Sequence, residues 1–232
     1  MKTSIIVTHK IFDDDLMHLS NINHKRIKEN THYPYELVFV DNASDEKYIS
    51  WLLRNCDTYI RNNENLGNAK SWDQGIKISS GETIILIDND VWVEKDWDKE
   101  MIDKLLEPNV GITFPYSIVG DEYDKKESGF SVEYRGRRDG FCFAFRRDTY
   151  DYVGEFLLNQ PFKLGYYEDD MFAYRVQYIM KHKLVACPSS KVWHKGQGTT
   201  KKMWTLEMIK GIEDNKKWYE DLTNKIYPFI DK

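Results

Sequence analysis

The 232-residue sequence contains no long apolar run. A membrane-spanning helix needs about 20 consecutive apolar residues, and charged or polar side chains interrupt every apolar stretch here well before that length. The N-terminal segment MKTSIIVT also lacks the apolar core and the small-residue cleavage site of a signal peptide. We therefore expect a cytoplasmic protein with no stable membrane insertion, whose first residues form a strand.

The sequence also has few cysteines and no excess of positive charge. The three cysteines, Cys56, Cys142 and Cys187, are odd in number and have no CxxC or CxxH spacing, which argues against a disulfide framework and a structural zinc site. The formal net charge of −5 makes a large general affinity for nucleic acid phosphates unexpected, although Arg135, Arg137 and Arg138 make a small basic spot. We expect three free thiols and rank a nucleic-acid-modifying role behind the functions below.

Three common enzyme signatures are missing. A nicotinamide or flavin enzyme would show GxGxxG after its first strand, because glycines let the backbone approach the pyrophosphate. Here the corresponding turn reads THKIFD. Neither the GxxxxGK[ST] phosphate loop nor the GxSxG nucleophile elbow occurs. Dehydrogenase, P-loop and hydrolase functions are therefore disfavoured.

The first half of the chain repeats one pattern: a short apolar run, a polar cluster, and a segment with helical spacing. The runs are rich in Val, Ile and Leu, which is typical of strands that helices cover on both faces. The predicted strands are 4–8, 36–41, 58–61 and 83–88, and the predicted helices are 14–29, 45–55 and 68–79. The sequence thus predicts an α/β fold with an open, mostly parallel sheet flanked by helices.

After residue 110 the pattern is less regular, and the sheet is expected to become mixed. The elements predicted here are a strand at 140–146, a long helix at 168–183, two short strands at 184–187 and 191–193, and one or two amphipathic helices at 203–222. We expect one domain at 1–200, with halves 1–110 and 111–200, and a C-terminal helical extension at 201–232 packed on it.

Polar side chains follow each of the four predicted parallel strands. Ligands of open α/β sheets bind outside the carboxyl ends of the strands, so these clusters should line one crevice. The clusters are Thr8-His9, Asp41–Asp45, Asn62–Gly67 and Asp88–Asp90. The sequence therefore predicts a binding site at this edge of the sheet.

Two acidic clusters carry the strongest chemical signal, DND at 88–90 and EDD at 168–170. Paired carboxylates can serve a glycosidase as acid and as base or nucleophile. However, Asp88 and Asp90 follow a strand with a small amide between them, and such a turn also suits a hard cation. Mg²⁺ and Mn²⁺ are often held by one or two carboxylates plus substrate phosphates. A metal and a phosphate-bearing substrate account better for two unequal clusters.

Six motifs in order resemble the inverting GT-A glycosyltransferases of family 2, which transfer a sugar from a nucleotide diphosphate donor. The resemblance covers about residues 3–200. The motifs are IVT ending at Thr8, VFVDNASD with Asp41, NENLGNAKSWDQGI with Asn65 and Lys70, GETIILIDND ending at Asp90, YYEDDMFAYR with Asp169, and VWHKGQG with His194. The resemblance implies a GT-A, Rossmann-like fold and a donor that is usually a UDP-sugar.

The resemblance also implies roles for individual residues. Those implied to bind the donor are Thr8 and Asp41 at the nucleobase, Asn65 and Lys70 near the ribose and phosphates, and Asp88 with Asn89 on the ribose side. Those implied to bind Mn²⁺ or Mg²⁺ are Asp90 and His194. A divalent cation would stabilise the negative charge that builds on the leaving diphosphate.

The proton chemistry is assigned to the second acidic cluster. An acceptor hydroxyl must lose a proton as it attacks, and a carboxylate within hydrogen-bond reach can take it. By register with the family's Glu-Asp pair, Asp169 is the implied base. Asp170 is the rival base, and Glu168 is expected to orient the acceptor or the base. The structural alternative is a helix start, where the macrodipole favours acidic residues.

Two other functions stay open at this point. A nucleotidyltransferase of similar fold would need a glycine-rich, basic loop after the first strand, which THKIFD is not. A nucleotide-sugar or glycan binding module would not need both acidic clusters. The sequence leaves the oligomeric state and the acceptor open, and the acceptor classes considered are a glycan, a lipid, a protein and a modified nucleobase.

Overall fold

The computed structural model describes residues 2–119, 132–133, 140–156, 161, 164–196, 202 and 205–226. The strands are β1 Thr3–His9, β2 Tyr35–Asn42, β3 Thr58–Asn62, β4 Thr83–Asp88, β5 Val91–Val93, β6 Val110–Val119, β7 Val132–Glu133, β8 Cys142–Arg146 and β9 Lys183–His194. The helices are α1 Asp14–Asn30, α2 Glu46–Arg54, α3 Gly67–Ile78, α4 Lys99–Leu105, α5 Arg147–Val153, α6 Glu168–Tyr174, the π-helix η1 Arg175–Ile179 and α8 Leu206–Ile226.

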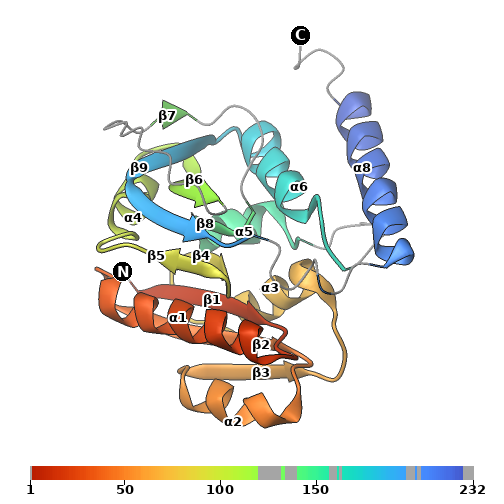
Figure 1. Ribbon diagram of the computed structural model, residues 1–232. Helices are drawn as coiled ribbons and strands as arrows, with labels where there is room; N and C mark the ends of the chain where they lie inside the picture. Colours follow the sequence, from red (N-terminus) through yellow and green to blue (C-terminus); the bar gives the residue numbers. More distant parts are fainter. Residues whose placement is uncertain are drawn as a thin grey trace.

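All of these strands belong to one mixed sheet (Figure 1). Its order is β3-β2-β1-β4-β8-β6-β9-β5, and the short β7 pairs with β9. The strands β1 to β4 run parallel, whereas β8 is antiparallel to both β4 and β6, and β5 is antiparallel to β9. The predicted α/β class, with a parallel N-terminal half and a mixed second half, is confirmed.

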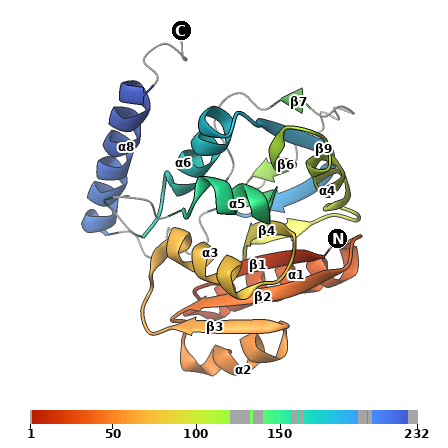
Figure 2. The same ribbon diagram turned by 180° about the vertical axis from the view of Figure 1, so that it is seen from behind.

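Alternate residues of the central strands enter two apolar layers, one on each face of the sheet. On β1, Ile5 and Val7 face the layer that α1, α2 and α4 cover, whereas Ile6 faces the layer that α3, α5 and α6 cover. Figures 1 and 2 show the two sets of helices on opposite faces. Because both faces are buried, these strands need apolar side chains at every position, which is the pattern seen in the sequence.

Two predictions for the second half are wrong. The helix predicted at 168–183 is α6 followed by η1, and the chain leaves it at Lys181, whose positive φ of 60° turns the backbone toward β9. The two strands predicted around Pro188 are one strand, β9. Both halves pair with β6, and a bulge absorbs the residues between Cys187 and Lys191.

Five elements were not predicted, namely β5, α4, β6, β7 and α5. At the C-terminal end, the segment predicted as one or two helices holds the single long helix α8, which lies beside α6 in both views (Figures 1 and 2). The three cysteines are free thiols, as expected. Within the residues that the structure describes, none of the helices combines the length and apolarity needed to cross a bilayer. The division into a domain and an extension stays a prediction.

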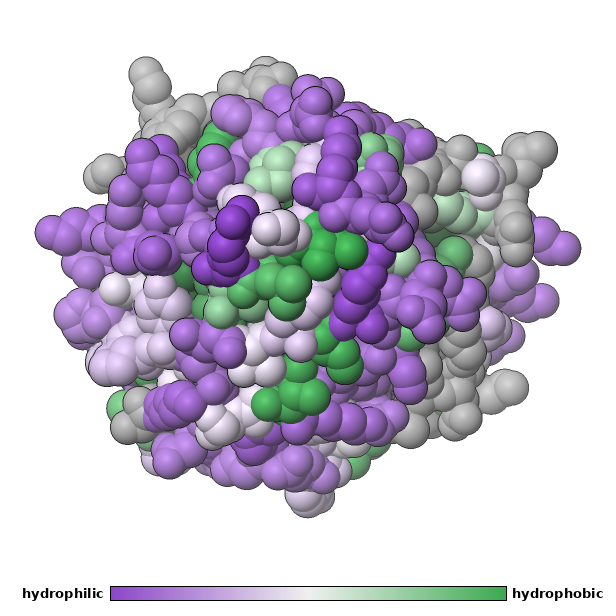
Figure 3. Space-filling view, turned by 90° about the horizontal axis from the view of Figure 1, so that it is seen from below, coloured by the Kyte–Doolittle hydropathy of each residue, from purple (hydrophilic) through white to green (hydrophobic). Residues whose placement is uncertain are grey.

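The face of the molecule shown in Figure 3 is mostly hydrophilic. The face seen from below Figure 1 carries a limited group of apolar side chains among hydrophilic ones (Figure 3). The exposed large apolar side chains of the described residues come from separate segments, namely Leu53, Ile78, Leu106, Tyr152, Ile179 and Ile209. Single exposed apolar side chains of this kind are normal on a protein surface.

Candidate functional site

The parallel register brings the predicted polar clusters to one edge of the sheet. Thr8 of β1 pairs with Asp88 of β4 on one side, and the next residue, His9, pairs with Asp41 of β2 on the other. The three strands end within one residue of each other in this register. The strand ends thus place Thr8 between β2, which carries Asp41, and β4, which carries Asp88.

On the β2 side, Asp41 is buried and its carboxylate accepts three hydrogen bonds. The donors are the backbone amide of Ser44 at 2.8 Å, the hydroxyl of Tyr59 at 2.7 Å, and the guanidinium of Arg61. Burial and the neighbouring Asp41 raise the pKa of Tyr59 to about 12. Sequence reasoning missed Tyr59 and Arg61. The available signal was their spacing of two along β3, which places both side chains on the same face.

The hydroxyl of Thr8 lies at these strand ends without a hydrogen-bond partner among the described residues. Its Oγ1 atom is buried. A buried hydroxyl without a partner is costly unless a ligand or water satisfies it. Thr8 is therefore a ready hydrogen-bonding group at the point where β1, β2 and β4 end.

Asn65 and Lys70 lie on either side of the start of α3. The Oδ1 atom of Asn65 accepts from the amide of Gly67 at 3.0 Å, and Gly67 has a positive φ of 78°. Lys70 is partly buried on the first turn of the helix. Neither residue belongs to the cluster of Asp88, Asp90 and His194, and their role in donor binding stays a prediction.

The turn between β4 and β5 is held by side chains of α1. Asn23 of α1 donates from Nδ2 to the carbonyl oxygens of Asp88, at 3.2 Å, and Val91, at 2.6 Å. The side chain of Asn89 donates to the Oγ atom of Ser20 on α1 at 2.8 Å. The Asn89 side chain is thus directed at α1, where it fixes the turn, and the flanking carboxylates are the groups that the turn presents.

Asp88, Asp90 and His194 converge at this turn. Each offers one ligand atom, and these atoms all lie within 4.8 Å of one another. The pairing of β5 with β9 sets the position of His194, whose Nε2 atom lies 3.2 Å from Oδ1 of Asp90. The His194 ring stacks on Phe141 with centroids 4.0 Å apart. The predicted pair of Asp90 and His194 is brought together, and Asp88 joins it.

This donor set fits a divalent cation of the Mg²⁺ or Mn²⁺ type. Two carboxylates supply hard oxygen ligands, and an imidazole nitrogen is a common ligand for transition metals such as Mn²⁺. Burial raises the pKa of the Asp88 carboxyl well above its ordinary value, and the nearby charges of Asp90, Glu168 and Asp169 raise it further. A cation would relieve that crowding of like charges.

The second acidic cluster occupies the first turn of α6 and reaches the same place. The carboxylate of Asp169 lies against the backbone of Gly140, so that a Cβ atom there would come within 2.1 Å of Oδ2 of Asp169. The next residue, Phe141, accepts a backbone hydrogen bond from Asp88 at 2.8 Å. Gly140 therefore permits the close approach that brings Asp169 beside the β4 turn.

Burial raises the pKa of Asp169 well above its ordinary value, and the charges of Asp170 and Glu168 raise it further. Glu168 is also buried, with 3% of its surface exposed. A carboxylate with a raised pKa accepts a proton more readily than a solvated one. The Asp169 carboxylate, with its raised pKa, therefore lies near the Asp88 carboxylate of the β4 turn.

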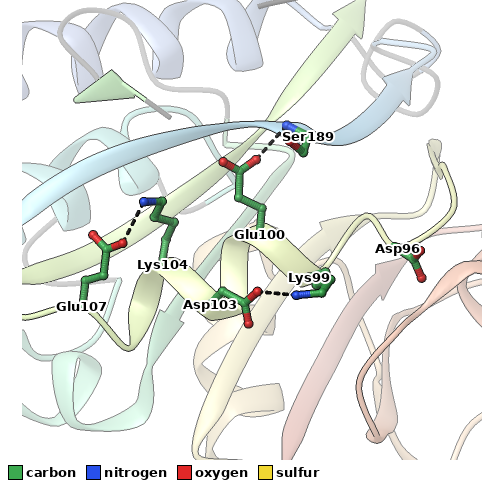
Figure 4. Close-up of a pocket in the computed structure, with 7 residues that line it drawn as sticks. All are labelled: Asp96, Lys99, Glu100, Asp103, Lys104, Glu107 and Ser189. Atoms are coloured by element: carbon green, nitrogen blue, oxygen red, sulfur yellow. Dashed lines mark hydrogen bonds and ion pairs between the residues drawn. The ribbon is translucent and has the colours of Figure 1, made fainter. Parts of the chain in front are cut away.

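A separate hollow of about 440 Å³ lies along α4 (Figure 4). Its lining residues are Asp96, Lys99, Glu100, Asp103, Lys104, Glu107 and Ser189. Most of these charges pair with each other, as in Lys99 with Asp103 at 2.6 Å and Lys104 with Glu107 at 2.7 Å. The lining holds four acidic residues and two lysines, so it stays net acidic after these pairs form, and the cluster of Asp88, Asp90 and His194 is the better candidate site.

The chain resembles one protein family and several solved structures. Residues 23–183 match the sequence profile of glycosyl transferase family 2. No curated protein sequence matches the chain. Among solved structures, GalNAc-T7 with UDP, GalNAc and Mn²⁺ is similar, with a TM-score of 0.68 and 16% identity, over 84% of this chain and 44% of that one.

Two further structures have comparable similarity. The mannosyltransferase PcManGT from Pyrobaculum calidifontis, in complex with GDP-Man and Mn²⁺, gives a TM-score of 0.65 and 16% identity over 85% of this chain and 58% of that one. S. aureus TarS 1-349 gives a TM-score of 0.63 and 14% identity over 85% and 61%. The chain thus spans roughly half of the length of the structures it resembles, and at these identities the likeness establishes the shared fold.

Proposed function

The chain belongs to glycosyl transferase family 2 and has a GT-A fold, and we propose that it transfers a sugar from a nucleotide diphosphate sugar to an acceptor hydroxyl with inversion. The observation that carries this proposal is the convergence of Asp88, Asp90 and His194 at one strand end, with the Asp169 carboxylate beside them. A cation site and a base are the two chemical needs of such a transfer.

We propose that Asp90, His194 and Asp88 hold Mn²⁺ or Mg²⁺. Their carboxylate oxygens suit either ion, whereas the imidazole nitrogen of His194 suits Mn²⁺ better than Mg²⁺. Mn²⁺ accompanies a nucleotide or nucleotide sugar in the GalNAc-T7 and PcManGT structures. When bound, the cation supplies Lewis-acid stabilisation of the charge on the leaving diphosphate. The contact of Asp88 with the donor ribose, expected from the sequence, stays a prediction alongside this ligand role.

We propose that Asp169 takes the proton of the acceptor hydroxyl on one of its carboxylate oxygens. Its raised pKa and its fixed place against Gly140 support this role. The roles of Asp170 as an alternative base and of Glu168 as an orienting group stay predictions. Geometry near the transfer site matters strongly, because a displacement of about 1 Å can cost a hundredfold in rate.

We propose a UDP-sugar as the donor. The unsatisfied hydroxyl of Thr8 and the ordered carboxylate of Asp41 support a nucleobase site between β1 and β2. Roles for Asn65, Lys70 and Asn89 in donor binding stay predictions. The structural relatives contain UDP in one case and GDP-Man in another, so both nucleotides belong in the assay.

The test is turnover of nucleotide sugars. Purified protein with Mn²⁺ should release nucleoside diphosphate from at least one of a panel of UDP- and GDP-sugars. Asp90→Ala should lose Mn²⁺ binding and turnover together, whereas Asp169→Asn should retain Mn²⁺ binding and lose about a hundredfold or more in rate. Asp148→Asn, at an exposed acidic position on α5, is the matched control and should turn over normally.

The outcome also separates the alternatives. Release of pyrophosphate from a nucleoside triphosphate would identify a nucleotidyltransferase instead. Saturable binding of a nucleotide sugar without turnover, across a broad range of acceptors, would identify a binding module. Full activity of Asp169→Asn on its true acceptor would remove Asp169 as the base and leave Asp170 as the candidate.

A further inference from the structure

The turn that leads into the acidic cluster has an unusual backbone. Three consecutive residues have positive φ angles, namely Gly165 at 150°, Tyr166 at 72° and Tyr167 at 71°. Only glycine adopts such angles without a steric penalty, so two successive tyrosines there need support from their surroundings. Tyr167 is the N-cap of α6, and its backbone therefore sets the direction in which the acidic first turn begins.

That support comes from the C-terminal helix. Asn215 of α8 is fully buried, and its Nδ2 atom donates to the carbonyl oxygens of Gly165 at 3.0 Å and Tyr166 at 3.1 Å. The two hydrogens of one amide thus satisfy two successive carbonyls of the strained turn. One helical turn later on the same face of α8, the Tyr219 ring lies 5.6 Å from the Tyr167 ring, measured between centroids.

The turn at 165–167 sets the position of the Asp169 carboxylate, which has little free space around it. The amide of Met171 donates to the carbonyl oxygen of Tyr167 at 3.0 Å, which joins the turn to the helix that carries Asp169. The Asp169 carboxylate in turn lies so close to Gly140 that even a Cβ atom would overlap it. A small rotation of the first turn of α6 would therefore move this carboxylate away from the β4 turn.

We propose that Asn215 is a positioning residue, which holds the left-handed turn at 165–167 and thereby fixes Asp169 for proton transfer. This inference rests on the proposed function for its catalytic consequence. It makes the C-terminal helix a part of the catalytic apparatus, acting from outside the segment that matches the family profile, which ends at residue 183.

The chemistry of the contact dictates the variants. Asn215→Leu keeps the approximate size and removes both donors, and Asn215→Asp faces the two carbonyls with a carboxylate. Asn215→Gln keeps both donors on a chain that is longer by one methylene group. Asp214→Asn, at the exposed neighbouring position, is the matched control. Asn215 contacts Gly165 and Tyr166, which are not among the proposed cation ligands. Calorimetric titration with Mn²⁺ alone therefore checks that a variant at 215 leaves the cation site intact.

Kinetics and amide hydrogen exchange of the full chain test the proposal. In Asn215→Leu and Asn215→Asp we expect kcat to fall by about 10- to 100-fold, with little change in the donor KM or in Mn²⁺ affinity. Amides of 166–171 should exchange faster, while those of the central strands keep their protection. Asn215→Gln should recover part of the kcat, and Asp214→Asn should match the wild type.

Other results would overturn the proposal. Unchanged exchange at 166–171 in Asn215→Leu would show that the amide does not hold the turn. Loss of protection throughout the sheet, with kcat falling only in proportion to the folded fraction, would reduce Asn215 to a general stabilising role. If the wild type itself turned over no donor, the proposed function would fail, whereas the exchange measurement would still decide whether Asn215 holds the turn.

Discussion

Replacement of the buried His9 should make the protein more resistant to acid. This histidine lies at the end of β1 with none of its surface exposed, and its ring packs edge-on against Phe39, with centroids 4.4 Å apart, and against Trp51 at 6.2 Å. Neither ring nitrogen has a hydrogen-bond partner among the described residues. Burial lowers the pKa of His9 from 6.5 to about 3, although the nearby Asp41 opposes the shift.

The sign of the effect follows from where the proton binds. Between pH 6.5 and about 3, the unfolded chain binds a proton at His9 that the folded chain does not. The free energy of unfolding therefore falls as the pH drops through this window. Each unit of difference in pKa is worth about 1.4 kcal/mol, so His9 should lower the free energy of unfolding by roughly 3 kcal/mol at pH ~4.5 and by roughly 5 kcal/mol at the acid limit.

The substitution His9→Phe isolates this contribution. Phenylalanine fills the same aromatic surroundings and removes two unsatisfied polar atoms, so stability at about pH 7 should be equal or higher. Urea unfolding followed by tryptophan fluorescence, at about pH 7 and about pH 4.5, gives the free energy of unfolding at each pH. The loss between the two should be smaller in His9→Phe by about 2–3 kcal/mol.

The comparison with wild type matters because buried carboxylates also contribute to acid unfolding. Their contribution is common to both proteins and cancels in the difference. His18→Gln, at an exposed position on α1, is the matched control and should follow the wild-type pH dependence. Equal losses in wild type and His9→Phe would refute the reasoning, since they would mean that His9 is protonated in the folded protein or is not buried in solution.

Two further predictions concern close packing. Gly140→Ala should push the Asp169 carboxylate from its place, because the new Cβ would lie 2.1 Å from Oδ2; steady-state kinetics should show kcat reduced by about tenfold or more with Mn²⁺ binding retained, and normal kcat would contradict the assignment of Asp169. Trp72→Ala should lower the free energy of unfolding by about 3–5 kcal/mol in urea titrations, because the buried indole packs against Phe143 and Phe156.

The sequence predicts the N-terminal half of the fold well because its strands are buried on both faces. Such strands must be apolar at nearly every position. The runs that contain Ile5, Val38 and Ile85 can therefore be recognised as strands from the sequence alone, without knowledge of the strands they pair with. The short strand β5 is not visible in this way. Three residues give no measurable period, and β5 exists because it pairs with β9 beside His194.

The residues of the candidate site likewise fall into those that the sequence indicates and those that it does not. Asp88, Asp90, His194 and Asp169 belong to local motifs, and the sequence identifies them although they are far apart along the chain. Residues whose role depends on a contact with a distant part of the chain have no sequence motif that identifies them. Gly140 looks like an ordinary loop glycine until Asp169 lies against it, and Asn215 is one polar residue in an amphipathic helix until its two acceptors are located.

The junction between the two halves of the site consists of backbone hydrogen bonds. Asp88 donates from its amide to the carbonyl oxygen of Phe141 at 2.8 Å, and Lys195 donates in the same way to the carbonyl oxygen of Asp90 at 3.1 Å. Bonds of this kind depend on strand register and do not depend on the side chains at 141 and 195. The spacing between the carboxylates of the β4 turn and the residues that face them is therefore fixed by the pairing of β4 with β8 and of β5 with β9.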